Sequence, residues 1–563
     1  MPSTRPRPPS LRALSAALLL FPLAAPAAGT AAPDTGTILQ QVKPAPAQPA
    51  PQTKPGLKIE SPAGRNVPPG QPFAVKTITL SGNTRFDTAT LHALVAAGEG
   101  KTIDLAQLDK LAQRITDYYQ QHGYPLARAV IPAQTIHNGV VKIEIVEARY
   151  GRIRLDNHSR VHDDLLQATL APLQGGALIK QARLNHTLLL LSDMPGVSVN
   201  ATLRPGDTVG TSDLQVQTAS PAFLTGSLTL DNYGNRYTGR VRGGGTLYVI
   251  NPLHHGDLLD ANILSSGSGL VYGRIGYQTQ LNGYGTRLGG ALTAVHYALG
   301  NTLKALGSDG NAYVGNLWVQ HPFIRSLALN LYGRMEYQHK WLHDRIKTGS
   351  VRNDRELDVV VFGLSGNRHD DFLAGGITSL AADVTGGRVH FDDAVAAAND
   401  RATVDTQGGF LKWGGTLSRL QTLTPADSLY LSIQAQWANG NLDSSEQMLG
   451  GGPYSVRAYD IGALSGDAGY QGTIELRHNF GAIALGTWQG RAFIESAHLT
   501  INQDPWSPGP NSATLSGAGV ELDWQGSHRL TAALVVATPF GGTPALLRPQ
   551  RATRAWVEVS ERF

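Results

Sequence analysis

The residue best placed to do chemistry in this sequence is Arg457, which stands in the stretch GGPYSVRAYD at residues 451–460. The flanking segments, 429–438 and 473–479, alternate in the manner of β-strands. A plain hairpin loop would account for the glycines and Pro453. A long loop inside an all-strand region more often carries function, and an arginine there can bind a carboxylate with both arms of its planar fork.

The residues around Arg457 resemble a known family. Leu449-Gly450-Gly451, Val456-Arg457-Ala458-Tyr459 and Gly466-Asp467 are similar to the inward-folded loop of the two-partner secretion outer-membrane transporters, the haemolysin-activator and filamentous-haemagglutinin-transporter family. In the wider superfamily, which includes the barrel-assembly insertase, the motif is usually Val-Arg-Gly-Phe or Val-Arg-Gly-Tyr. Ala458 stands where that glycine would be. The resemblance implies that Val456, Arg457, Ala458 and Tyr459 lie on a loop inside a barrel lumen.

The same resemblance supplies a candidate partner for the arginine. The stretch RAFIESA, residues 491–497, resembles a superfamily strand motif of phenylalanine, acid and glycine at alternate positions. The motif implies that Phe493 lies beside the loop and that Glu495 holds Arg457. Glu495 replaces the usual aspartate and Ala497 the usual glycine. The alternative is that Arg457 and Glu495 are two unconnected lumen charges.

Enzymatic and nucleic-acid functions find no support in the sequence. It has no Gly-x-Ser-x-Gly elbow, phosphate loop or His-Glu-x-x-His motif, and its 17 histidines are scattered apart from His254-His255. The net charge of +4 is small for 563 residues, and no basic run suggests nucleic acid. We therefore predict a protein that is not an enzyme, with no cofactor, no metal site and no nucleic-acid partner.

The region that must position the loop is residues 221–563, which shows hardly any helical periodicity. Leucines and glycines from Leu224 to Leu230 alternate with polar residues, as expected for strands with one face on lipid and one on a polar lumen. At roughly 10 residues per strand plus a turn or loop, the region holds about 16 antiparallel strands. The sequence ends on an alternating strand whose last residue, Phe563, resembles the signal read by barrel-assembly machinery.

Two small α+β domains are predicted before the barrel, at residues 73–148 and 149–220. Each has the order strand, helix, helix, strand, strand, and the first helix of the first domain is predicted over residues 88–97. A helix that starts at Asp104 with Gln107 three residues later begins like a capping box. The stretches GYPLARAVIP and GVVKIEIVEARYGRI resemble the first polypeptide-transport-associated (POTRA) domain of the same transporters. The resemblance implies that both domains lie in the periplasm.

The N-terminus is predicted to direct export. Residues 1–28 have the order of a signal peptide: arginines, an apolar core and small residues. A transmembrane anchor is the alternative, but prolines interrupt a run well short of the ~20 residues that span a bilayer. Residues 29–72 are a proline-rich linker with a candidate helix at 37–42, capped by Asp34 or Thr35. The resemblance implies that this helix plugs the pore.

Together these features predict an all-β transmembrane barrel in a Gram-negative outer membrane, preceded by two periplasmic α+β domains. Its predicted function is to recognise an unfolded exoprotein in the periplasm and translocate it to the surface or medium. The resemblance implies a haemolysin- or adhesin-like β-helical partner, which export could activate, and barrel-assembly machinery during biogenesis. The alternatives are an insertase that folds other barrels and a passive channel or surface receptor.

Overall fold

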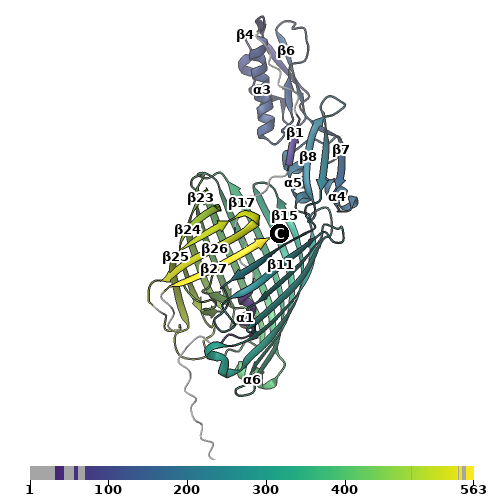
Figure 1. Ribbon diagram of the computed structural model, residues 1–563. Coiled ribbons are helices and arrows are strands. Elements are labelled where there is room, and N and C mark those ends of the chain that lie inside the picture. Colours follow the sequence, from purple (N-terminus) through teal and green to yellow (C-terminus); the bar gives the residue numbers. More distant parts are fainter. Residues whose placement is uncertain are drawn as a thin grey trace, which may run out of the picture.

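The computed structural model describes residues 32–43, 48, 56–60, 70–483, 485–542, 544–547 and 553–563. The predicted signal peptide and parts of the predicted linker lie outside the described residues. Figure 1 shows a tall barrel with two smaller domains stacked at one end, and helix α1 (Thr35–Gln41) inside the barrel. Among the described residues, no helix combines the length and the apolar character needed to cross a bilayer.

The barrel is a closed ring of 16 antiparallel strands, in which chain order is also spatial order. This confirms the predicted fold class. The strands of the first half are β10 (Leu224–Asp231), β11 (Arg242–Ile250), β12 (Leu258–Ser265), β13 (Leu270–Gln280), β14 (Arg287–Ala298), β15 (Ser308–Arg325), β16 (Leu329–Ile346) and β17 (Val351–Asp370). Those of the second half are β18 (Gly376–Phe391), β19 (Gly408–Thr422), β20 (Asp427–Ala438), β23 (Ala468–Ile483), β24 (Gly486–Thr500), β25 (Ser512–Gln525), β26 (Leu530–Pro539) and β27 (Arg554–Arg562).

Short elements lie in the connections between barrel strands. The 3₁₀ helices η2 (Asn301–Leu306) and η3 (Ser527–Arg529) follow β14 and β25, and helix α6 (Ala394–Arg401) follows β18. Asp393 caps α6 by accepting hydrogen bonds from the backbone N–H groups of Val395 and Ala396.

The two faces of the barrel wall differ in polarity, as the alternation predicts. Apolar side chains such as Leu228 and Ile263 are 61% and 67% exposed on the outer face, where lipid would cover them. The neighbouring positions face the lumen, and many are charged, including Glu475 and Arg477 on β23. Because side chains on a strand point alternately to opposite faces, one pattern builds both surfaces.

The barrel closes where its first strand meets its last. β10 pairs with β27 from Ser227–Arg562 to Asp231–Glu558. Phe563 extends the seam by one step, since its N–H donates to Gly226 O at 3.0 Å and the N–H of Gly226 donates to Phe563 O at 3.2 Å. The Phe563 ring covers Gly226 so closely that a Cβ atom there would lie 2.6 Å from the ring. The terminal phenylalanine therefore packs on the closing seam.

The first of the two smaller domains contains β2 (Phe73–Val75), β3 (Thr77–Ser81), α2 (Thr88–Ala93), the 3₁₀ turn η1 (Ala96–Gly98), β4 (Lys101–Ile103), α3 (Leu105–Gln121), β5 (Arg128–Val130) and β6 (Val140–Val146). The predicted capping box is present at the start of α3, with Asp104 and Gln107 in reciprocal hydrogen bonds. The helix predicted over 88–97 breaks into α2 and η1, because the chain tightens into a 3₁₀ turn.

Glu147 is a buried carboxylate at the end of this domain. It accepts hydrogen bonds from the N–H groups of Thr84 and Arg85, both at 2.8 Å, and from the Tyr119 hydroxyl at 2.7 Å. Burial alone raises the pKa of Glu147, but the hydrogen bonds, led by those from Thr84, outweigh burial and leave the pKa below its usual 4.5. The carboxylate therefore ties the loop before α2 to helix α3.

The second domain contains β7 (Arg149–His158), α4 (Asp163–Leu170), α5 (Gln181–Ser192), β8 (Ser198–Pro205) and β9 (Thr211–Ala219). Its sheet has the order β1-β8-β9-β7, so a fourth strand, β1 (Gly56–Ile59), joins it from the linker. The sequence did not predict β1, because a four-residue segment among prolines gives too short an alternation to distinguish from an extended linker.

The second domain is attached to the barrel by charged contacts with the turns at its near end. Arg325, at the end of β15, forms two hydrogen bonds with Asp193, at 2.6 and 2.7 Å. Arg160 donates to Ile250 O at 3.0 Å, and the N–H of His162 donates to His254 O. His254-His255 thus lies at a domain junction. The second domain thus lies directly against this end of the barrel, and the first domain stands beyond it (Figure 1).

Candidate functional site

The loop between β20 and β23, residues 439–467, folds back into the barrel. Two short strands in it, β21 (Met448–Gly450) and β22 (Leu464–Gly466), pair with each other and pack on β24. Beyond β21 the chain turns at Gly451, where φ is 88° and a Cβ atom would lie 2.5 Å from Asp460 O. Only glycine fits such a turn without strain, and the turn directs the chain toward the barrel wall.

Arg457, at the tip of this loop, is 6% exposed and faces three carboxylates of the wall. Its Nε donates to Glu495 Oε1 at 2.7 Å, and its backbone N–H donates to Glu495 Oε2 at 2.7 Å. Its two terminal nitrogens donate to Glu475 at 2.8 Å and to Glu521 at 2.6 Å. The structure therefore brings Arg457 and Glu495 together, and one guanidinium joins three neighbouring strands, β23, β24 and β25.

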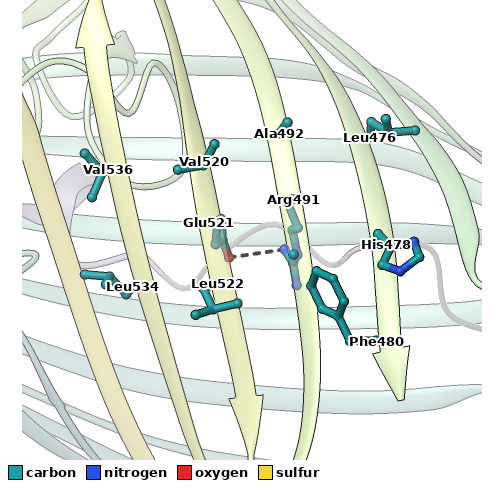
Figure 2. A pocket seen from close by; sticks show the side chains of 11 residues that line it. Leu476, His478, Phe480, Arg491, Ala492, Val520, Glu521, Leu522, Leu534 and Val536 are labelled. Carbon is teal, nitrogen blue, oxygen red and sulfur yellow. Dashed lines mark ion pairs between the residues drawn. The ribbon is translucent and has the colours of Figure 1, made fainter. Parts of the chain in front are cut away.

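Further arginines of the wall extend this network. Arg477 binds Glu475 at 2.8 Å, and Arg491 binds Glu521 at 3.3 Å and Asp523 at 2.7 Å. Figure 2 shows the ion pair between Arg491 and Glu521 on adjacent strands, among apolar side chains of the same part of the wall. Glu475 and Glu521 thus each pair with a second arginine besides Arg457. Among the described residues, Glu495 forms ion pairs with Arg457 alone.

The predicted neighbour Phe493 lies under the arginine. The guanidinium carbon of Arg457 is 3.3 Å from the centre of the Phe493 ring, so the cation stacks on the ring face. The carbonyl of Arg457 accepts a hydrogen bond from Trp556 Nε1 at 2.7 Å, which adds a contact from β27. The loop tip is therefore held by charge, ring stacking and a backbone hydrogen bond together.

The departures from the superfamily motif are accommodated by the surrounding packing. Ala458 does not adopt a positive φ, so its methyl group costs no backbone strain. That methyl lies where Gly517 of β25 has no side chain, since a Cβ atom at Gly517 would lie 2.5 Å from it. Ala497 is fully buried in the same apolar cluster as Val456 and Tyr459. Glu495, longer than aspartate by one methylene, reaches both the side chain and the backbone of Arg457.

Sequence reasoning missed Glu475, Glu521 and Trp556. The two glutamates carried a signal, because each lies at an alternate, lumen-facing position of a strand whose neighbours face outward. The sequence does not say which lumen-facing acids reach the loop, since that depends on strand register around the ring. Trp556 carried the same positional signal, since it alternates with the exposed Ala555 and Val557 on β27, but the sequence does not say that its indole meets the loop.

Helix α1 occupies the lumen beside the loop (Figure 1). Asp34 caps it, as predicted, and accepts a hydrogen bond from the N–H of Thr37 at 2.9 Å. The N–H of Thr35 donates to Asp344 on β16 at 2.8 Å, and Ile38 is fully buried against β-strand side chains. The observed helix begins two residues earlier than the predicted one, because Asp34 rather than Thr35 is the cap.

One buried arginine, Arg355 on β17, joins α1, the wall and the lumen loop. It donates to Asp34 at 2.8 Å, to Asp344 at 2.7 Å, and to Asp443 of the loop. Ser444 bridges the same groups, since its hydroxyl donates to Asp34 at 2.6 Å. The helix and the loop are therefore fastened at one shared point.

The far end of α1 meets a second charged cluster. Glu446 of the loop pairs with Lys340 and, at 2.7 Å, with Lys412. Lys43, two residues beyond α1, and Lys412 both line the space next to this cluster. Beside this cluster lies a cavity whose lining includes Lys43, Lys412 and six glutamine side chains from α1, the loop and the wall: Gln40, Gln41, Gln434, Gln436, Gln447 and Gln471.

Within the part of the chain that the structure describes, no three histidines or acids are grouped so as to hold a metal ion. The charged clusters are instead ion pairs that join two separate segments, α1 and the loop, to the continuous barrel wall. Such an arrangement can hold two segments in a pore in a defined place.

Comparison with known proteins agrees with this geometry. A family model described as "POTRA domain, ShlB-type" matches residues 73–148, and one described as "Haemolysin secretion/activation protein ShlB/FhaC/HecB" matches residues 210–495. The heme/hemopexin transporter protein HuxB of Haemophilus influenzae is 26% identical over 538 residues, covering 93% of this chain and 94% of the relative. The outer membrane transporter CdiB of Escherichia coli is 26% identical, covering 92% of this chain and 85% of the relative.

A solved structure shares the architecture. That of CdiB from Escherichia coli matches with a TM-score of 0.68 and 23% identity, covering 89% of this chain and 93% of that one. A match at this identity shows a shared fold, whereas the family models show membership of a family. The second family model spans half of the sequence. The closed barrel and the two smaller domains before it are consistent with that family. The chain therefore belongs to the haemolysin secretion/activation protein family ShlB/FhaC/HecB, the outer-membrane transporters of two-partner secretion.

Proposed function

We propose that this chain exports an unfolded partner protein from the periplasm through the lumen of its own barrel, to the cell surface or medium. The observation that carries the proposal is that α1 and the loop at 439–467 fill the lumen and are fastened to the wall by ion pairs at Arg355 and Arg457. A pore closed by separate segments can open while its wall stays intact, because only the fastening contacts need to break.

The polar cavity in the lumen supports passage of a polypeptide. Its six glutamine side chains carry donors and acceptors but no charge, and they come from α1, the wall and the loop, beside two lysines and apolar residues of the loop. An extended chain could form transient hydrogen bonds with the amides whatever its own sequence. A lining of mixed character would hold a passing chain less tightly than a wholly charged or wholly apolar surface would.

Capture of the client is assigned to the two periplasmic domains, residues 73–148 and 149–220. Both contain small sheets with short strands at their edges, and edge strands can pair with an extended chain. The domains stand directly at the entrance of the barrel, since Asp193 and Arg325 join the second domain to a barrel turn. A captured segment would therefore be close to the lumen.

The chemical class of the partner follows from the family. Its description, haemolysin secretion and activation, favours a haemolysin- or adhesin-like β-helical exoprotein. Residues 29–72 would serve as plug helix and linker, and 1–28 as the signal peptide. Phe563 would present the last strand to barrel-assembly machinery, since it closes the seam in the folded barrel.

The test is co-expression of this chain with the large exported repeat protein that we expect its neighbouring reading frame to encode. We expect the exoprotein in the medium with the full chain, and none after deletion of residues 73–218. The deletion should leave a barrel that migrates heat-modifiably on a gel. Export that persists without residues 73–218 would contradict the proposal, and loss of unrelated outer-membrane proteins instead would favour the insertase.

A further inference from the structure

The barrel wall is tallest where its longest strands, β15, β16 and β17, lie side by side. They have 18, 18 and 20 residues, although about 9–11 residues of a tilted strand are enough to cross a bilayer. The two smaller domains are periplasmic, and the second of them contacts Arg325 at the end of β15. The hairpin between β16 and β17 is therefore at the opposite, extracellular end, where its outer face stands beside the outer leaflet of the membrane.

Two arginines face each other across this hairpin. Arg345 on β16 is directly opposite Arg352 on β17 in the antiparallel register. Both are exposed on the outer face, and among the described residues neither side chain forms an ion pair or a hydrogen bond. Like charges directly opposite each other destabilise a sheet. An anion bound between the two arginines would relieve that repulsion.

The nearby acids do not supply this anion, because they have other partners. On the outer faces of β15 to β17, Asp309 pairs with Lys347, Asp354 with His343, and Glu356 and Asp358 with His339. The ion pair of Asp309 and Lys347 is long, at 3.6 Å, and Lys347 is 79% exposed in the turn of the hairpin. Lys347 therefore adds a third basic side chain to the tip of the hairpin.

The height of the arginines above the membrane follows from an aromatic pair, Tyr313 and Trp341. These residues are directly opposite each other on β15 and β16, and both are exposed on the outer face. Aromatic side chains in such positions form the girdle at the interface of a transmembrane barrel. Arg345 is four residues beyond Trp341, which is about 13 Å along the strand. The arginines thus lie above the acyl chains, at the level of the headgroups.

An apolar groove of about 480 Å³ lies on the outer face beside the aromatic pair, which forms part of its lining. Three other residues of the lining, Ile263, Ile275 and Leu292, are each more than half exposed. Between them Gly273 and Ala294, which are opposite each other on β13 and β14, carry little or no side chain. The groove therefore offers an acyl chain a recess directly below the headgroup level.

We propose that this part of the outer wall is a binding site for lipopolysaccharide. The arginine pair binds anionic groups on its sugars, and the groove takes one of its acyl chains. The planar fork of arginine suits phosphates and carboxylates, which it can bind with two parallel hydrogen bonds. A phospholipid fits less well, because its phosphate lies directly above its acyl chains, whereas lipopolysaccharide also carries anionic groups on sugars farther out. The site faces away from the lumen, so the inference does not depend on the proposed export.

The test is native mass spectrometry of the full-length protein in detergent, with deep-rough lipopolysaccharide added as the probe. Arg345→Gln with Arg352→Gln should lower the fraction of protein that carries the lipid at least tenfold, since each basic side chain near a membrane surface contributes about a factor of five. The matched control is Arg368→Gln with Arg529→Gln, which removes two exposed arginines at the periplasmic end of the barrel. The control should bind as the unaltered protein does.

A second pair of variants tests the groove. Gly273→Phe would fill the recess without a clash, because a Cβ atom there would meet nothing within 4 Å. It should lower lipopolysaccharide binding at least threefold. Gly243→Phe adds the same side chain on β11, at a position that is equally open but outside the groove, and should leave binding unchanged. Phosphatidylglycerol, offered in place of lipopolysaccharide, should bind more weakly and respond to neither the arginine pair nor the groove.

Three results would overturn the proposal. The first is equal lipopolysaccharide binding by the arginine variant and its control. The second is equal binding by Gly273→Phe and Gly243→Phe. The third is phosphatidylglycerol that binds as well as lipopolysaccharide and is lost in the same variants, which would show a phospholipid site instead. Heat-modifiable migration of every variant confirms that the barrels compared are folded, as expected for changes at exposed positions.

Discussion

Replacing Arg457 with alanine removes the cation that three wall carboxylates share. Glu495, whose side chain is 3% exposed, loses its ion-pair partner, whereas Glu475 keeps Arg477 and Glu521 keeps Arg491. Breaking a buried pair by removing one partner costs about 3–5 kcal/mol, because it leaves an uncompensated buried charge. Since about 1.4 kcal/mol is a factor of ten, the docked state of the loop should lose roughly 10²–10⁴-fold in population relative to the undocked state.

The assay compares docking of the loop, abundance of the barrel and secretion in one set of strains. Arg457→Ala should leave a heat-modifiable barrel, make the loop at 439–467 susceptible to added protease, and impair secretion. Arg457→Lys should rescue in part, because lysine keeps the charge but loses the fork that reaches three carboxylates.

Two further variants make the comparison quantitative. Glu495→Gln should be milder than Arg457→Ala, because Arg457 would retain Glu475 and Glu521. This revises the expectation from sequence of an isolated pair. The matched control is Arg419→Ala, which removes a bidentate pair with Asp370 that is about one-quarter exposed. The hydrogen-bond partners of Arg419 among the described residues lie outside the loop, so loop protection should be unchanged in this variant. The reasoning would be refuted if Arg457→Ala left loop protection and secretion unchanged. It would also be refuted if Arg419→Ala lost as much loop protection and secretion as Arg457→Ala.

Three other predictions concern the plug, the first domain and the seam. Deleting residues 34–55 should raise single-channel conductance in planar bilayers without stopping export, and equal conductance would count against a plug. The lowered pKa of Glu147 means that this carboxylate stabilises the first domain above pH 4.5 and ceases to do so as the pH falls through the lowered pKa. Hydrogen exchange in β6 should therefore speed up in acid, and Glu147→Gln should lose about 1.5–3 kcal/mol of protection at pH 7 with little further loss in acid. Phe563→Ala should lower the yield of heat-modifiable barrel, since it uncovers Gly226 at the seam, and an unchanged yield would show that the ring is dispensable.

The sequence predicted the barrel well, because its signal is local and repeated. A strand with one face on lipid and one in a polar lumen alternates over its whole length, and this pattern recurs around the ring. The helix at Asp34 and the capping box at Asp104 were equally local, since a cap needs only residues within one turn. Where an element was predicted, the differences lie near its ends, as where the helix predicted at 88–97 divides into two.

The sequence could not predict contacts that depend on closure of the ring. Arg355 meets Asp34, more than 300 residues away, because the lumen brings α1 and β17 together. The partners of Arg457 beyond Glu495 depend in the same way on the register of β23, β24 and β25. β1 was missed for another reason, since its four residues form a strand only by pairing with a domain placed far along the chain.

The central claim, that the exported chain passes through the lumen, is tested most directly by photo-crosslinking at adjacent positions of β20. Gln434 lines the polar cavity and accepts a hydrogen bond from Gln471 at 2.7 Å, whereas Ile433 is 50% exposed on the outer face. A photoreactive amino acid would be placed at either position while an exoprotein fused to a stably folded domain is stalled in transit. We expect an adduct with the exoprotein from position 434 and none from position 433. An adduct from 433 alone, or none from 434 while the unfused exoprotein is still secreted, would contradict passage through the lumen.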